Sequence, residues 1–298
     1  MVTRHLAHLS IAMKPSKETF LAALNEVENF SPAPLILSNA MKLLKDPHSD
    51  IDSIATLVGR DSALATDIIR CANSAYFGGE RSGNVFEAVQ KIGLRETMRL
   101  LNLAVARIVS RRDLGCYGIS GSDYWAESLF NGLFLHVLAR ETGKYDPEVA
   151  YTAGLLRYIG RLAINQAIEN LYGGLYWNGN ESITEWEREN VGLAQAEAGA
   201  MLLRKWNFPD DAVQAVAAQD DLTQLSGENW LAEALHFATA LLPQGLGTPF
   251  LPAVGPTWSP TPEVTDFMNR HQLTPAAIDA MLMLTSQSYD EIRANFEA

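Results

Sequence analysis

Helix-forming signals recur along almost the whole chain, and they constrain the fold more than any other feature of the sequence. Apolar residues at helical spacing, for example Leu94, Met98, Leu101 and Val105, mark an amphipathic helix. No segment shows the convincing apolar–polar alternation that is typical of a half-buried strand. The sequence therefore predicts an all-α fold.

Short motifs predict where several helices begin. Asp146-Pro147-Glu148 combines an N-cap aspartate, a proline at the first helical position and an acid that faces the helix dipole. Ser49-Asp50-Ile51-Asp52 and Thr184-Glu185-Trp186-Glu187 have the form of capping boxes. Thr261-Pro262 and Thr274-Pro275 are each typical of a cap followed by a first-turn proline. Two or three short helices are expected to close the chain.

Glycine- and proline-rich segments predict how the chain is divided. Residues 113–122 contain three glycines and are interpreted as the joint between two helical bundles. Residues 243–262 contain six prolines and three glycines, which excludes regular structure there. The expected parts are a helical segment at 1–24, two packed bundles at about 25–115 and 120–225, and a C-terminal helical extension at 226–298.

Composition narrows the classes of partner. The formal net charge is −12, so the chain repels phosphate backbones on average and nucleic-acid binding is not expected. No apolar run is long enough to span a bilayer. Only two cysteines occur, Cys71 and Cys116, and a pair of buried thiols in a reducing cytoplasm is the simplest interpretation. We therefore expect a cytoplasmic protein without membrane contact.

Several motifs in the sequence belong together. Asn73-Ser74-Ala75-Tyr76-Phe77-Gly78 is followed by Ala88-Val89-x-x-Ile92-Gly93, and later by Trp125-x-x-Ser128, Gly154-Leu155-Leu156-x-x-Ile159-Gly160 and Gly199 to Trp206. Over about residues 25–225 this pattern resembles the HDOD domain, the HD-related output domain of bacterial signalling proteins. That family is a degenerate relative of the HD metal-dependent phosphohydrolases. The resemblance implies two packed bundles and a regulatory role.

The resemblance also implies which positions would hold a metal in catalytic HD relatives. Here those positions are occupied by Glu127, Arg157, Tyr158, Gln195, Gln219 and Asp220. A guanidinium cannot be a metal ligand, and a hard divalent cation needs several anionic or imidazole ligands. We therefore expect no bound metal, no cofactor and no catalysis. The Gly-Leu-Leu and Ile-Gly frame around Arg157 and Tyr158 would then serve helix packing.

The two arginines of this frame have two interpretations. If a cavity survives, Arg157 and Arg161 could bind an anionic ligand such as a nucleotide. The favoured alternative is that Arg157 pairs with Glu127 and fills the cavity. Either way, we expect Glu127, Arg157, Tyr158 and Asp220 to lie together.

A second group of candidate polar residues lies in the first bundle. We expect Asp61 or Ser62 to cap the helix that follows, while Asn73 and Ser74 end that helix and bond the next loop. A small-molecule or partner site at Asp61, Asn73 and Ser74 is the alternative. His136 is interpreted as a hydrogen-bonded core histidine. His5 and His8 are interpreted as an exposed, incidental pair.

These observations favour a non-catalytic bacterial signal-transduction protein that acts by binding a protein partner or a small signalling molecule. A divergent metal-dependent phosphohydrolase that uses Glu127, His136 and Asp220 is the enzymatic alternative. A nucleotide sensor built on Arg157 and Arg161 is the third.

Overall fold

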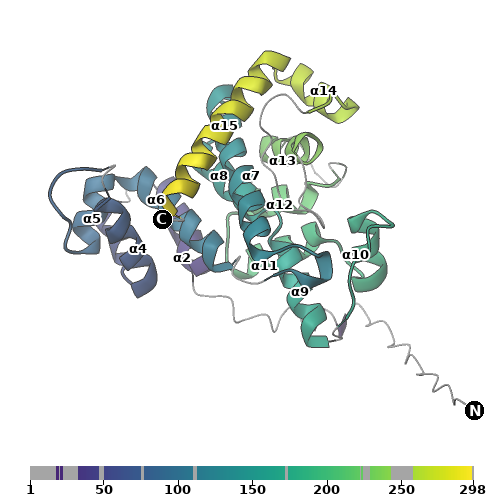
Figure 1. Cartoon of the computed structure of the whole chain (residues 1–298), viewed down its shortest axis with the longest axis horizontal. Coiled ribbons are helices and arrows are strands. Elements are labelled where there is room, and N and C mark those ends of the chain that lie inside the picture. Colours follow the sequence, from purple (N-terminus) through teal and green to yellow (C-terminus); the bar gives the residue numbers. More distant parts are fainter. Residues whose placement is uncertain are drawn as a thin grey trace, which may run out of the picture.

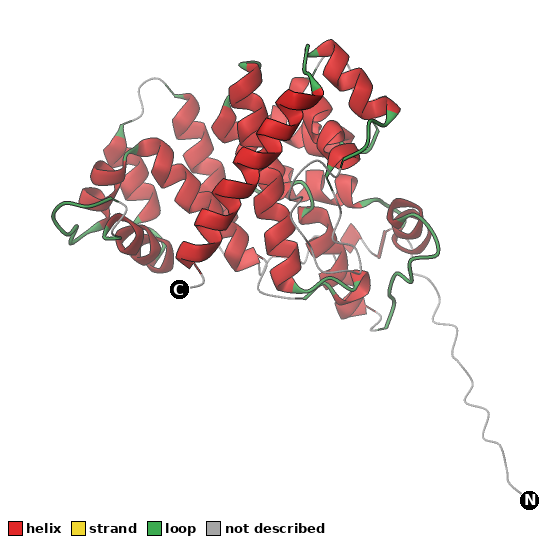
Figure 2. Cartoon of the chain, turned by 45° about the horizontal axis from the view of Figure 1, so that its top comes forward, coloured by secondary structure: helices red, strands yellow, loops and turns green. Residues whose placement is uncertain are grey.

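The computed structural model describes residues 18–19, 21–22, 33–46, 50–74, 77–109, 113–171, 174–221, 223, 229–242 and 258–296. Within these ranges the chain is helical and has no strand, only a bridge between Leu114 and Ile119 (Figure 2). The predicted all-α fold is confirmed. No helix in the described ranges has both the length and the hydrophobicity needed to cross a membrane. His5 and His8 lie outside these ranges.

The helices form two groups, as the sequence predicts. The first bundle comprises α2 (Ala33–Lys45), α3 (Ile51–Val58), α4 (Ser62–Ala72), α5 (Val85–Ile92) and α6 (Leu94–Val109). A 3-10 turn, η1 (Gly115–Tyr117), leads into the second bundle, which comprises α7 (Gly121–Thr142), α8 (Pro147–Leu156), α9 (Ile159–Leu171), α10 (Ile183–Val191), α11 (Gln195–Lys205) and α12 (Asp210–Ala218). In Figure 1, α4 and α5 lie at one end of the molecule, and α9, α10 and α11 lie toward the other. Helix α6 joins the groups by packing on α7 and α8.

Three further helices follow the second bundle. They are α13 (Trp230–Leu241), α14 (Pro262–Arg270) and α15 (Pro275–Phe296). Helices α13 and α15 pack on the second bundle, and α14 packs on α13. The prediction of short closing helices is wrong for α15, which is 22 residues long and packs along α7. Its buried residues Ile278, Met281, Leu282 and Tyr289 form one continuous apolar face, which explains its length. Residues 243–257 of the proline-rich segment lie outside the described ranges.

Local capping chemistry sets the helix starts, although two of the predicted caps are misplaced. Asp146 accepts hydrogen bonds from the first turn of α8, and Thr261 caps α14, as predicted. The box predicted at Ser49 is wrong, because α3 begins later and Asp50 caps it by accepting from Ser53. The box predicted at Thr184 is also wrong, because Ser182 and Glu185 form it two residues earlier.

The glycine frame brings helix backbones into direct contact. A Cβ atom added to Gly154 on α8 would lie 2.6 Å from the carbonyl oxygen of Asn131 on α7. One added to Gly160 on α9 would lie 1.9 Å from the carbonyl oxygen of Gln195 on α11. Both distances are shorter than a van der Waals contact, so only glycine fits. The predicted packing role of the frame is confirmed, and the residues between these glycines are thereby held inside the bundle.

Candidate functional site

Two buried arginines lie close together, one in the turn between α8 and α9 and the other in the first turn of α9. Arg157 is the C-terminal cap of α8 and is fully buried, and Arg161 on α9 is 2% exposed. The ring of Tyr158 contacts both, with its centroid 4.7 Å from Cζ of Arg157 and 3.8 Å from Cζ of Arg161. An aromatic face attracts a cation at these distances, so Tyr158 stabilises both guanidinium groups. Residues Glu127, Asn131, Arg157, Tyr158, Arg161, Glu187 and Gln219 are called the arginine cluster below.

The guanidinium of Arg157 connects three neighbouring helices. Its Nε donates to Oε1 of Gln219 at 3.1 Å, and its Nη1 donates to Oδ1 of Asn131 at 2.8 Å. Its Nη2 donates to the carbonyl oxygen of Leu235 at 2.9 Å and to Oγ1 of Thr239. Gln219 returns a bond from Nε2 to the carbonyl oxygen of Arg157 at 2.8 Å. Arg157 therefore ties α7, the end of α12 and α13 to the end of α8.

The partner of Glu127 differs from the prediction. Nη1 of Arg161 lies 3.5 Å from Oε2 of Glu127, and both side chains are buried. The predicted Arg157–Glu127 pair is therefore wrong. Arg161 lies one helical turn further along the chain, on α9, and faces Glu127 on α7. The donors of Arg157 are already bonded to Asn131 on α7, to Gln219 at the end of α12 and to two oxygen atoms on α13. Burial acts to lower the pKa of Arg161, but Glu127 and other neighbouring groups hold it above its ordinary value.

Glu187 is a member of the cluster that sequence analysis missed. Its Oε1 accepts from the hydroxyl of Tyr117 at 2.9 Å, and its Oε2 accepts from the backbone N–H of Gln195 at 2.7 Å. Burial raises the pKa of this carboxyl to about 7. Because α11 has no side-chain cap of its own, Glu187 supplies one from α10. The sequence contained one signal for a buried role of Glu187. This acid precedes Val191 by four residues, so both lie on the same apolar face of an amphipathic helix.

The structure brings together the positions at which the resemblance implies metal ligands in catalytic relatives. Gln195 and Gln219 are buried, and Asp220 is half-buried at the edge of the cluster. Asp220 raises the pKa of Tyr158, after the larger effects of burial and of the neighbouring arginines and Glu127. Glu127, Arg157 and Asp220 thus all lie within electrostatic reach of Tyr158.

This donor set does not suit a metal ion. The resemblance to the HD fold would place a divalent cation among these positions, but here they are occupied by two guanidinium groups, and the side-chain amide of Gln219 is already bonded to Arg157. Within the described ranges, no group of three His, Cys, Asp or Glu side chains converges to hold a metal. Glu127, His136 and Asp220, the ligands of the enzymatic alternative, are therefore not gathered into one such site.

The candidate polar residues of the first bundle have the structural geometry that the sequence predicts. Oδ1 of Asp61 accepts from the backbone N–H of Leu64 at 3.1 Å, which caps α4. Asn73 donates from Nδ2 to the carbonyl oxygen of Ser82 and accepts from its backbone N–H. The backbone N–H of Ser74 bonds to the carbonyl oxygen of Cys71 in the turn that ends α4. These contacts fix the loop at 77–84.

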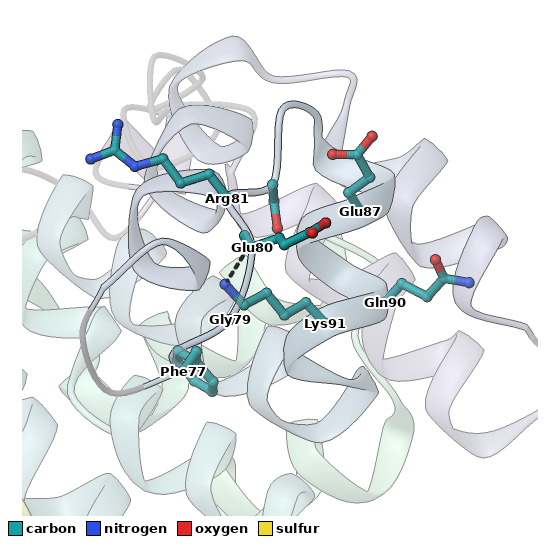
Figure 3. Close-up of a pocket in the computed structure, with 8 residues that line it drawn as sticks. Phe77, Gly79, Glu80, Arg81, Glu87, Gln90 and Lys91 are labelled. Atoms are coloured by element: carbon teal, nitrogen blue, oxygen red, sulfur yellow. Dashed lines mark hydrogen bonds between the residues drawn. The ribbon is translucent and has the colours of Figure 1, made fainter.

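That loop and α5 line an open pocket of about 500 Å³, shown in Figure 3. Nζ of Lys91 donates to the carbonyl oxygen of Glu80 across it. Oε2 of Glu87 accepts from the backbone N–H of Gly83. Figure 3 shows the guanidinium of Arg81 directed away from Lys91. The pocket carries both signs of charge, and the predicted site residue Asn73 shapes its rim through Ser82.

His136 lies between the two bundles. Its Nε2 is 2.8 Å from Nη2 of Arg99 on α6 and 3.4 Å from Oε1 of Glu148 on α8. The predicted hydrogen-bonded core histidine is confirmed, and its partners belong to the junction of α6, α7 and α8.

Comparison with known proteins identifies the family. Residues 31–222 match the family model of the HDOD domain. The chain belongs to the HDOD family. An uncharacterized protein of Treponema pallidum (strain Nichols) is 26% identical over 215 residues, which cover 70% of this chain and 41% of that protein. This HDOD chain thus spans about two fifths of the length of that relative.

Solved structures support the same fold. An HDOD domain protein of unknown function from Geobacter sulfurreducens superposes with a TM-score of 0.61 at 19% identity, over 94% of this chain and 96% of its own. A protein from Marinobacter aquaeolei VT8, assigned provisionally to signal transduction, gives 0.67 at 18% identity over 93% of this chain and 64% of its own. One from Shewanella amazonensis SB2B, assigned provisionally as a phosphohydrolase, gives 0.59 at 19% identity over 90% of this chain and 97% of its own. At these identities the likeness concerns the fold alone.

Proposed function

We propose that this HDOD protein is a non-catalytic regulator in bacterial signal transduction, which acts in the cytoplasm by binding a protein partner. The observation that carries the proposal is the arginine cluster. Fully buried Arg157 donates to four protein oxygen atoms at a position where a catalytic relative needs a metal ligand. A site filled by its own side chains can stabilise a fold, but it offers no open coordination position for a substrate.

Two alternatives remain open to test. A divergent phosphohydrolase would need metal ligands at Glu127, His136 and Asp220, although His136 bonds to Arg99 at the bundle junction. A nucleotide sensor would need its phosphates to reach Arg157 and Arg161. Both guanidinium groups are buried, so a nucleotide would first have to displace their present contacts.

The catalytic alternative is tested by hydrolysis of p-nitrophenyl phosphate and bis-p-nitrophenyl phosphate, each with added Mn²⁺, Mg²⁺ or Fe²⁺. We expect the rate of the wild-type protein to equal that of its Glu127→Gln variant with every ion. Metal-dependent turnover that disappears in Glu127→Gln would contradict the proposal.

The sensor alternative is tested by thermal unfolding in the presence of a nucleotide panel, because a ligand that binds the folded state raises the midpoint temperature. The proposal expects no concentration-dependent rise. A rise that Arg161→Gln abolishes would establish the nucleotide sensor in its place.

A further inference from the structure

Polar contacts make up part of the interface between the two bundles. Nη2 of Arg99 on α6 meets Nε2 of His136 on α7 at 2.8 Å, and Nε of Arg99 lies 3.7 Å from Oε1 of Glu148 on α8. Further along the same helices, Oγ1 of Thr152 on α8 bonds to Oδ1 of Asn102 on α6 at 3.1 Å. Three helices thus meet through one cation, one imidazole and one carboxylate.

The Arg99–His136 contact requires a neutral imidazole. A guanidinium is a donor only, so Nε2 of His136 must offer its lone pair and the ring proton must reside on Nδ1. A second proton on Nε2 would remove the acceptor and place two cations beside Glu148. The imidazolium would then donate to Glu148, which already lies 3.4 Å away. Arg99, whose side chain is 42% exposed, can turn to water and to Glu96 on its own helix.

Three buried polar groups near the Arg99–His136 contact favour separation of the two bundles once that contact is lost. Nδ2 of Asn102, Oε2 of Glu148 and the hydroxyl of Tyr151 are buried and have no hydrogen-bond partner within the described part of the chain. A buried polar group without a partner costs free energy that it recovers on contact with water. Opening the interface would therefore return hydration to all three groups.

We propose that Arg99, His136 and Glu148 form a proton-sensitive latch, in which protonation of His136 releases α6 from α7 and α8 and lets the two bundles separate. Among the described residues, the charged and titratable groups in contact with His136 are Arg99 on α6 and Glu148 and Tyr151 on α8, and Glu96 on α6 pairs with Arg99. On its own helix, Arg140 lies one turn away and pairs with Glu141. A regulator with this latch would change the relative position of its bundles when the pH falls.

The test measures the distance between the bundles by pulsed electron spin resonance. Nitroxide labels are attached at Gln90→Cys on α5 and Glu197→Cys on α11, both exposed positions, in a Cys71→Ser background, because Cys116 is buried. Spectra are recorded at about pH 8 and at about pH 5. We expect one narrow distribution at the higher pH and an additional longer component at the lower pH.

Two variants identify the group responsible. His136→Gln offers Arg99 an amide oxygen at every pH, so only the short distance should appear under both conditions. His236→Gln is the matched control, because His236 is a half-buried histidine that bonds to the carbonyl oxygen of Gln219, away from α6. This control should keep the response of the wild-type protein.

Three results would overturn the latch: a wild-type distance that does not change with pH, a response that persists in His136→Gln, or a response that His236→Gln abolishes. If His136→Gln does not fold, Arg99→Gln decides instead, because Arg99 is half-exposed and its replacement leaves the core intact. The latch predicts the longer component at both pH values in Arg99→Gln, and the short distance alone at both would refute it.

Discussion

Replacing Arg157 by methionine tests whether the arginine cluster stabilises the fold. Methionine has a similar length and no donors, so Oδ1 of Asn131 and Oε1 of Gln219 lose the bonds that they now accept. The carbonyl oxygen of Leu235 keeps a bond from Oγ1 of Thr239 at 3.0 Å. The substitution therefore leaves two buried amide oxygen atoms without this donor and removes one buried charge.

The lost hydrogen bonds and the removed charge set the expected loss of stability in Arg157→Met. Each buried acceptor that loses its partner costs about 1–3 kcal/mol, and the two together cost about 2–6 kcal/mol. Removing a charge that had been taken out of water offsets part of this cost. We expect Arg157→Met to lower the free energy of unfolding by about 3 kcal/mol, a large share of the roughly 5–15 kcal/mol that is typical of folded proteins.

Urea unfolding followed by circular dichroism measures this change. Arg70→Met on the exposed face of α4 is the matched control and should stay within about 0.5 kcal/mol of the wild-type protein. The double variant Arg157→Met/Asn131→Leu should be less destabilised than the sum of its single variants, because donor and acceptor then disappear together. An Arg157→Met protein as stable as the wild type would refute the reasoning, because the guanidinium would then contribute no net stability.

Two further predictions concern the neighbours of Arg157. Because burial raises the pKa of Glu187 from 4.5 to about 7, the folded protein keeps a proton that the unfolded chain releases within this window. The free energy of unfolding should therefore fall by about 3 kcal/mol as pH rises from about 4.5 to about 7. Glu187→Gln should remove this dependence of stability on pH. If the dependence is unchanged in Glu187→Gln, another group causes it. Gly160→Ala places a Cβ against the backbone of α11 and should cost at least about 3 kcal/mol or prevent folding. Gly115→Ala meets no atom within 4 Å and should be nearly neutral, so equal effects of the two alanines on the unfolding midpoint would contradict the packing argument.

Local chemistry made much of the fold predictable from sequence. Asp146 and Thr261 act as caps through side chains that bond to N–H groups two or three residues away, so a short motif contains all the information. The packing role of the glycine frame was also predictable, because Gly154 and Gly160 allow close approach of another helix whichever helix that is. The misplaced caps at Ser49 and Thr184 show where prediction from short motifs fails, because several nearby residues can cap a helix and packing selects among them.

The contacts of the candidate site were less predictable because they depend on tertiary structure. The acceptors of Arg157 on α13 lie 78 and 82 residues away in sequence, and no local pattern joins them. The choice of Arg161 over Arg157 as the partner of Glu127 follows from where α8 ends and α9 begins. The sequence predicted which residues stand at the metal positions of catalytic HD relatives, whereas the contacts among these side chains became clear only from the packed helices.

Metal content tests the central claim most directly. The protein should be purified without chelators from cells supplied with Mn, Fe, Zn and Mg, and then measured by elemental mass spectrometry beside its Glu127→Gln variant. If the arginine cluster has replaced the metal, both proteins should carry far less than one ion per chain, and their contents should be the same. A stoichiometric ion in the wild-type protein that Glu127→Gln loses would contradict the account.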